Sequence, residues 1–154
     1  MPCLVWLRSA RFMAACALLL LPVASMASDI TIATDTGHRL EALKPQLRFE
    51  ADDTDMYTGV LDPVERAASD RAFASLVDTL VAQLPHLTKA FVLEQFQTTL
   101  STLPLSDTED RERAAKHCEK IMDVLGIESS DGVLNNWMYG PVLGHLLNKK
   151  AHEQ

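Results

Sequence analysis

Apolar residues recur at three- and four-residue steps through most of the chain, a spacing typical of amphipathic helices. No segment keeps the two-residue alternation of a strand for more than a few residues. The predicted helices occupy residues 38–49, 63–84, 89–101, 107–125, 133–139 and 142–150, the first of them bent at Pro45. We therefore expect an all-α fold, a compact bundle of five or six helices in a single domain over residues 38–150.

Capping residues mark the ends of these helices. Asp62 and Thr88 precede two of the apolar runs, and their side chains can accept backbone N–H groups of the first turn. Ser106 and Glu109 form a predicted capping box, and Gly126 is expected to end the helix that follows. In the 63–84 helix we expect a broad apolar face that begins at Val64.

The 107–125 helix has a predicted buried face made of Ala114, Ala115, Cys118, Ile121, Met122 and Leu125. Cys118 is expected to be a core side chain, because a reactive thiol needs an exposed and electropositive setting. His117 immediately precedes Cys118 and points about 100° away from it around the helix. The two residues are therefore not predicted to act as a nucleophile and its base.

The segment from Glu50 to Leu61 is acidic, contains Gly59 and is predicted to be a loop. Its oxygen-rich side chains invite comparison with a calcium loop, but Thr58 and Val64 stand where an EF-hand starting at Asp53 needs glycine and glutamate. We expect a solvated loop that the ring of Tyr57 anchors to the rest of the domain.

Residues 1–27 have the features of a secretory signal peptide. Arg8 and Arg11 precede an apolar run over residues 12–23, and Ser25-Met26-Ala27 provides a small-residue cleavage site. The run is shorter than the roughly 20 apolar residues that span a bilayer. We expect cleavage after Ala27 and a periplasmic or secreted protein without stable membrane insertion, with an uncleaved anchor as the alternative. Residues 28–37 are predicted to be an extended tether, and residues 151–154 to fray.

The charge balance is acidic, with 14 Lys and Arg against 21 Asp and Glu, a net charge of −7. Loss of Arg8 and Arg11 with the signal peptide leaves 12 basic side chains against 21 acidic ones, which is −9. Such a surface disfavours nucleic acid and favours either a basic protein partner or simple solubility. Cys118 is then the one cysteine left, so no internal disulfide is expected.

Catalytic and metal-binding patterns are weak. The histidines are scattered and form no zinc-binding pair, and the acids Glu109, Asp110 and Glu112 are typical of the first turns of a helix. Ser129 and Ser130 lack a nucleophile elbow. We therefore predict no catalytic residue, no metal ligand and no cofactor.

A polar and aromatic stretch between residues 129 and 139 is the candidate recognition patch. Trp137 lies within it and is expected to fill the core, with the asparagines capping the turn; recognition of a ligand or protein is the alternative. The patch consists of Ser129, Ser130, Asp131, Asn135, Asn136 and Tyr139.

The motifs D-T-E-D-R-E over 107–112, I-M-D-V-L-G-I-E-S-S-D-G-V-L-N over 121–135 and W-M-Y-G over 137–140 resemble a bacterial family of small exported all-helical domains of unknown function. The resemblance supports the helical fold and implies no activity and no catalytic residues.

The leading hypothesis is a non-enzymatic protein-binding module, such as an inhibitor or immunity protein for a basic partner. The alternative is a small enzyme or ligand-binding domain that uses the acids at 107–112 beside Tyr57 or Trp137. A subunit of a homodimer is a third hypothesis.

Overall fold

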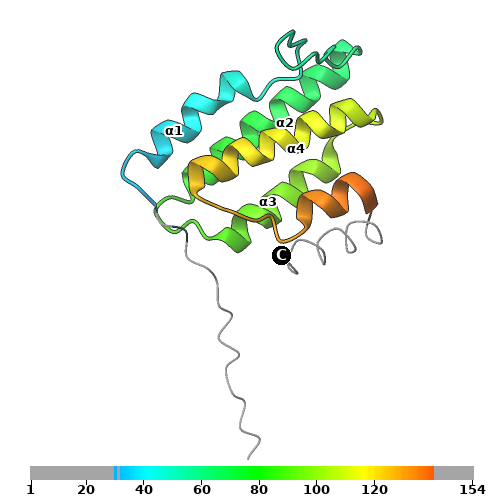
Figure 1. Cartoon of the computed structure of the whole chain (residues 1–154). Coiled ribbons are helices and arrows are strands. Elements are labelled where there is room, and N and C mark those ends of the chain that lie inside the picture. The colour runs from blue at the N-terminus through cyan, green and yellow to red at the C-terminus, as the bar shows by residue number, and fades with distance from the viewer. Residues whose placement is uncertain (1–29, 31, 141–154) are drawn as a thin grey trace, which may run out of the picture.

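The structure is a computed structural model that describes residue 30 and residues 32–140. Along this part of the chain, α-helices alternate with short connections (Figure 1). The elements are α1 (Thr36–Leu43), the 3-10 helix η1 (Lys44–Gln46), α2 (Pro63–Ala82), α3 (Lys89–Thr102) and α4 (Thr108–Leu125). A further helix is described over residues 133–140, and we call it the 133–140 helix.

These elements confirm the all-α prediction. The described residues contain no strand, and their β-pairing is the isolated antiparallel bridge between Asp52 and Tyr57. Pro45 lies in η1, where the predicted bend of the first helix falls. The predicted signal peptide, the last predicted helix and the predicted frayed end lie outside the described residues.

Side chains cap the helices at the predicted places, with one correction. The Asp62 carboxylate accepts the N–H groups of Val64 (2.7 Å) and Glu65 (3.3 Å), and the Thr88 hydroxyl accepts that of Phe91 (3.3 Å). The residue that caps α4 is Asp107, whose carboxylate accepts the Glu109 N–H at 2.8 Å, and not Ser106. A carboxylate is the stronger acceptor, and its charge suits the positive end of the helix dipole.

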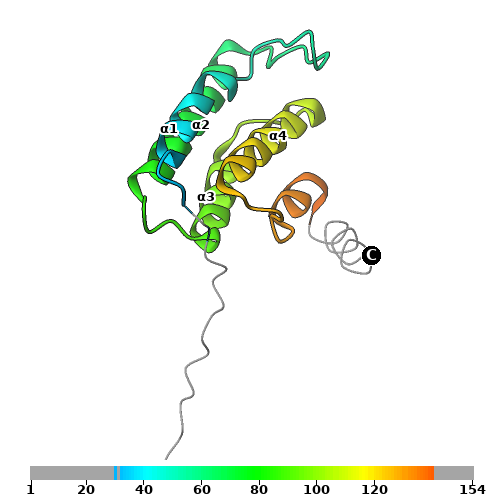
Figure 2. The same cartoon turned by 60° about the vertical axis from the view of Figure 1, so that its left-hand side comes forward.

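The core forms where α1 packs against α2 and α4, and where α2 packs against α3 (Figures 1 and 2). Its largest buried side chains include Phe49, Phe73 and Phe96. Val64 is 74 % exposed, so the prediction that it begins the apolar face of α2 is wrong. It is nine residues from Phe73, which at 100° per residue places it on the opposite side of the helix.

The start of the described chain packs more closely than an extended tether would. Helix α1 begins at Thr36, two residues before the predicted start, and the Thr36 side chain is buried. Ile30 and Ile32 are half-buried against the core. Burial of these β-branched side chains stabilises a segment that was predicted to remain loose.

Cys118 and His117 both lie in the core. The burial of Cys118 confirms the prediction and raises the pKa of its thiol above the usual range. The ring of His117 is fully buried and makes edge contacts with Phe49 and Phe73, at centroid distances of 5.1 and 5.2 Å. The buried face of α4 is therefore wider than its apolar residues indicated.

The hydrogen bonds of His117 define its tautomer. Its Nε2 lies 3.1 Å from the carbonyl oxygen of Arg48, and a carbonyl only accepts, so Nε2 carries the proton. Nδ1 has no hydrogen-bond partner among the described residues. Burial lowers the pKa of His117 to about 4, against the opposing effect of the Arg48 carbonyl and with a smaller contribution from the charge of Arg113.

We predict that this histidine makes the fold sensitive to acid. Between its ordinary value near 6.5 and the folded value of about 4, the unfolded chain binds a proton that the folded chain does not. Stability should therefore fall as the pH drops through this window, with a contribution of up to about 3 kcal/mol from His117. Urea unfolding at a series of pH values measures the slope. A His117→Gln variant with an unchanged slope between pH 4 and 6.5 would contradict the assignment.

Candidate functional site

The loop between η1 and α2 folds back on itself in a tight turn. Asp52 N donates to the Tyr57 carbonyl at 2.8 Å, Tyr57 N donates to that of Asp52 at 3.0 Å, and Val60 N donates to that of Phe49 at 3.0 Å. Gly59 has a φ of 79°, and a Cβ at this position would lie 2.7 Å from the backbone nitrogen of Ala51. Only glycine fits there, and the turn holds Tyr57 against the core.

Arg113 of α4 ties this loop to the helix bundle. Its side chain is 8 % exposed and donates from Nη2 to Asp52 at 2.8 Å and from Nη1 to Asp55 at 2.9 Å. The guanidinium also lies over the Tyr57 ring, 5.0 Å from its centroid. Because one cation engages both arms of the loop, the position of residues 52–57 depends on Arg113.

Two further groups around Arg113 have shifted pKa values. Hydrogen bonds from Thr54 and then from Arg113 hold the pKa of Asp52 well below its usual range, so this residue remains a carboxylate. Burial, followed by a 2.7 Å hydrogen bond to Asp110, raises the pKa of Tyr57 above its usual range. The Tyr57 hydroxyl therefore stays protonated and donates to Asp110, which confirms that Tyr57 anchors the loop.

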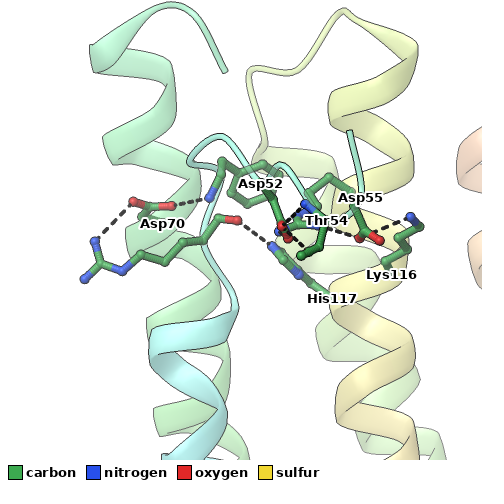
Figure 3. A network of polar contacts seen from close by, with 9 residues as sticks. Asp52, Thr54, Asp55, Asp70, Lys116 and His117 are labelled. Carbon is green, nitrogen blue, oxygen red and sulfur yellow. Dashed lines mark hydrogen bonds and ion pairs between the residues drawn. The ribbon is translucent and has the colours of Figure 1, made fainter. Parts of the chain in front are cut away.

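Figure 3 shows polar contacts that link the chain between η1 and α2 to α2 on one side and to α4 on the other. The Asp70 carboxylate on α2 accepts the Phe49 N–H at 3.0 Å, and the adjacent Arg48 carbonyl accepts from His117 on α4. Lys116 reaches Asp55 at 3.4 Å. Two helices therefore position the loop through its backbone as well as its carboxylates.

Three adjoining hollows of about 330, 250 and 500 Å³ run along the outer side of α4. The first and second share Glu112 and Lys116, and the second and third share Glu119, Leu134 and Asn135, so we treat them as one α4 groove. Figure 2 shows the 133–140 helix beside α4, where it forms one wall. The groove is lined by residues 55–57, 109, 112, 113, 115, 116, 119, 122, 123, 127–130, 134, 135, 138 and 139.

The floor of the α4 groove is a charged stripe on one helix face. Its members follow at steps of three and four residues, which places them in a line along α4. They are Glu109, Glu112, Lys116, Glu119 and Asp123. Asp55 and Glu128 add two acids at the walls, and Arg113 is the second base, so six acids face two bases in the groove, a balance of −4.

The structure brings together four of the six residues of the candidate recognition patch. Ser129, Ser130, Asn135 and Tyr139 line the α4 groove. Asp131 forms a 2.7 Å ion pair with Lys89 of α3 and is not among the lining residues. Asn136 is exposed and also lies outside the groove lining.

Trp137 is half-buried rather than a full core side chain. Its ring lies 4.8 Å from the guanidinium carbon of Arg111, which also donates to the Trp137 carbonyl. Leu134, three residues earlier, is buried in the core. Arg111 and Leu134 together hold the 133–140 helix against α4.

The acids at 107–112 take separate roles. Asp107 caps α4 and Asp110 accepts from Tyr57, whereas Glu109 and Glu112 line the groove from exposed positions. The potential nucleophile Cys118 and the base His117 are buried in the core. Of these acids, Glu109 and Glu112 are therefore the two that face solvent in the groove.

The sequence did not identify Arg113, Glu119, Asp123, Met56 or Met138 as parts of a site. The three- and four-residue spacing of the acids along the predicted helix is the signal that could have revealed the stripe. Within the described residues, no group of three His, Cys, Asp or Glu side chains could hold a metal ion. No helix in the described part of the chain is both long and apolar enough to cross a bilayer.

The fold and the groove define a small all-α domain with an acidic surface groove. The sequence model of the family described as "Domain of unknown function (DUF4844)" matches residues 31–142, and the chain belongs to this family. The chain is also similar to a solved structure, a DUF3571 family protein from Acinetobacter baumannii AYE, with 35 % identity and a TM-score of 0.61. The match covers 73 % of this chain and 94 % of that one. No curated protein matches the sequence.

These comparisons confirm the resemblance to a family of unknown function, and they assign no activity.

We predict that Arg113 contributes more to stability than either of its partners. An Arg113→Met substitution leaves two carboxylates facing each other without their cation and should lower the free energy of unfolding by about 2 kcal/mol or more. Asp55→Asn should cost less than about 1 kcal/mol, because the Asp55 side chain is 44 % exposed and water screens its pair. Urea denaturation of both variants compares them. Equal losses of unfolding free energy would show that the Arg113–Asp55 contact is an ordinary surface ion pair.

Proposed function

We propose that this chain is an exported, non-enzymatic protein-binding module whose partner is a positively charged polypeptide. The features of a signal peptide at residues 1–27 support export. The single observation that carries the binding role is the stripe of acids along the α4 groove. Its acids outnumber its bases, and it extends along most of a helix, so it matches an elongated cationic partner.

The ion pairs of the domain support the same role. Among the described residues, no ion pair within 4 Å involves Glu109, Glu112, Glu119 or Asp123, whereas Asp52, Asp55, Asp70, Asp78 and Asp131 all take part in one. Glu109 and Glu112 lie three residues apart, and Glu119 and Asp123 lie four apart, so each pair of like charges repels although Lys116 stands between the two pairs. A bound cationic segment would relieve that repulsion, and the gain would appear as affinity.

An inhibitor or immunity role follows naturally from such a surface. A stable acidic domain that covers the basic surface of an enzyme blocks access to that surface by occupying it. The partner would be recognised by its charge and shape, and the domain itself would need no catalytic group. The enzyme alternative, with catalysis by Glu109 or Glu112, is the weaker proposal, because Cys118 and His117 are buried in the core away from the groove.

A matched pair of double variants tests the binding role. Glu112→Gln with Glu119→Gln removes two charges from the groove, and Glu65→Gln with Glu94→Gln removes two charges from α2 and α3. Each tagged protein is used at low salt to capture partners from an extract of exported proteins of the source organism, followed by mass spectrometry.

We expect the unmodified protein and the α2/α3 variant to capture the same basic protein, and the groove variant to lose most of it. Captured protein should dissociate as salt is raised, since screening weakens exposed charge pairs. Capture of no basic protein, or equal capture by both double variants, would count against the proposal.

A further inference from the structure

We infer that the α4 groove binds an amphipathic basic helix, and not merely any cationic chain. This inference rests on the proposed binding role and specifies its ligand: a polypeptide segment with lysine or arginine on one face and large apolar side chains on the other. Two features of the groove support it, namely exposed apolar side chains on its walls and the spacing of its acids.

The walls of the groove carry large apolar side chains that water surrounds. The large hydrophobic residues exposed in the described part of the chain are Met56, Leu61, Val64 and Tyr139. Met56, 88 % exposed, lines the groove from the loop, and Tyr139, 50 % exposed, lines it from the 133–140 helix. Met138 lies beside Tyr139 in the lining. Flexible methionines next to acids are suited to apolar side chains of varied shape on a cationic ligand.

The backbone at Met56 points to the same conclusion. Its φ of 52° lies in the left-handed region, which is unfavourable for a residue with a side chain. The turn between Asp52 and Tyr57 and the ion pair of Asp55 hold it there. Backbone strain of this kind persists where the surrounding structure imposes it, and here it directs an apolar side chain to the wall of an acidic groove.

The spacing of the acids fits a helix. From Glu109 to Asp123 the stripe covers 14 residue steps of α4, which is about 21 Å at 1.5 Å per residue. A second helix of about four turns laid along this length presents cationic side chains at the same three- and four-residue steps. The same helix turns its apolar side chains toward Met56 on the loop and Tyr139 on the 133–140 helix.

Two synthetic peptides with equal numbers of lysines separate this inference from simple charge attraction. One is an amphipathic helix-forming peptide of leucine and lysine, and the other has every leucine replaced by serine. Isothermal titration calorimetry at low and at physiological salt measures both with the full chain. We expect the leucine-containing peptide to bind at least about tenfold more tightly and to lose less affinity when salt is raised.

Matched variants locate the apolar contact. Met56→Gln with Tyr139→Gln removes two exposed apolar side chains from the groove, and Leu61→Gln with Val64→Gln removes two from outside it. The first variant should reduce the preference for the leucine-containing peptide to about threefold or less, and the second should keep it. Since all four side chains are exposed, circular dichroism should show both variants folded.

Each result decides between the two proposals. Equal affinity for both peptides, weakened by Glu112→Gln with Glu119→Gln, would overturn the amphipathic helix and leave the cationic partner in place. A leucine preference that survives loss of Met56 and Tyr139 would also overturn it. Failure of both peptides to bind, or binding that the groove variants do not change, would overturn the proposed function itself.

Discussion

The buried guanidinium of Arg113 is the interaction on which the candidate site depends. It lies on α4, yet its partners Asp52 and Asp55 belong to a loop almost sixty residues earlier in the chain. The same group covers the ring of Tyr57, which in turn reaches Asp110 one turn before Arg113 on the helix. One cation therefore decides where the loop, its exposed Met56 and the end of the α4 groove lie. An uncompensated buried charge would be strongly destabilising, so these contacts form together or not at all.

His117 supports this arrangement one helical turn further along α4. Its ring fills space between Phe49 and Phe73, and its Nε2–H satisfies the carbonyl of Arg48 in the core. Asp70 of α2 satisfies the neighbouring N–H of Phe49. Residues 48 and 49 are not helical, so their backbone N–H and C=O groups have no hydrogen-bond partners within a helix. The side chains of Asp70 and His117 provide those hydrogen bonds. Burial of His117 on α4 is thus explained by the backbone carbonyl that it binds.

The sequence predicted the parts of the fold that local chemistry controls. Asp62 and Thr88 cap the starts of α2 and α3, and Gly126 caps the end of α4, as predicted. Capping can be predicted because it depends on residues a few positions apart. Arg113 and His117 could not be assigned to the core from local sequence. The spacing of apolar residues identifies a buried face, and it gives no information about polar side chains on that face. Their partners lie 58 to 69 residues away in sequence, and only the folded chain reveals them.

The groove could not be predicted for the same reason, because its walls come from two segments far apart in the sequence, the loop at 55–57 and the 133–140 helix.

The central claim is that ligands bind along α4 between these walls, and NMR chemical-shift mapping with the leucine–lysine peptide tests it most directly. We expect the amide shifts to change along residues 109–123, around Met56 and around Tyr139, while those of α2 and α3 stay in place. Changes that instead concentrate on α2 or α3, with α4 unaffected, would contradict this account of the site.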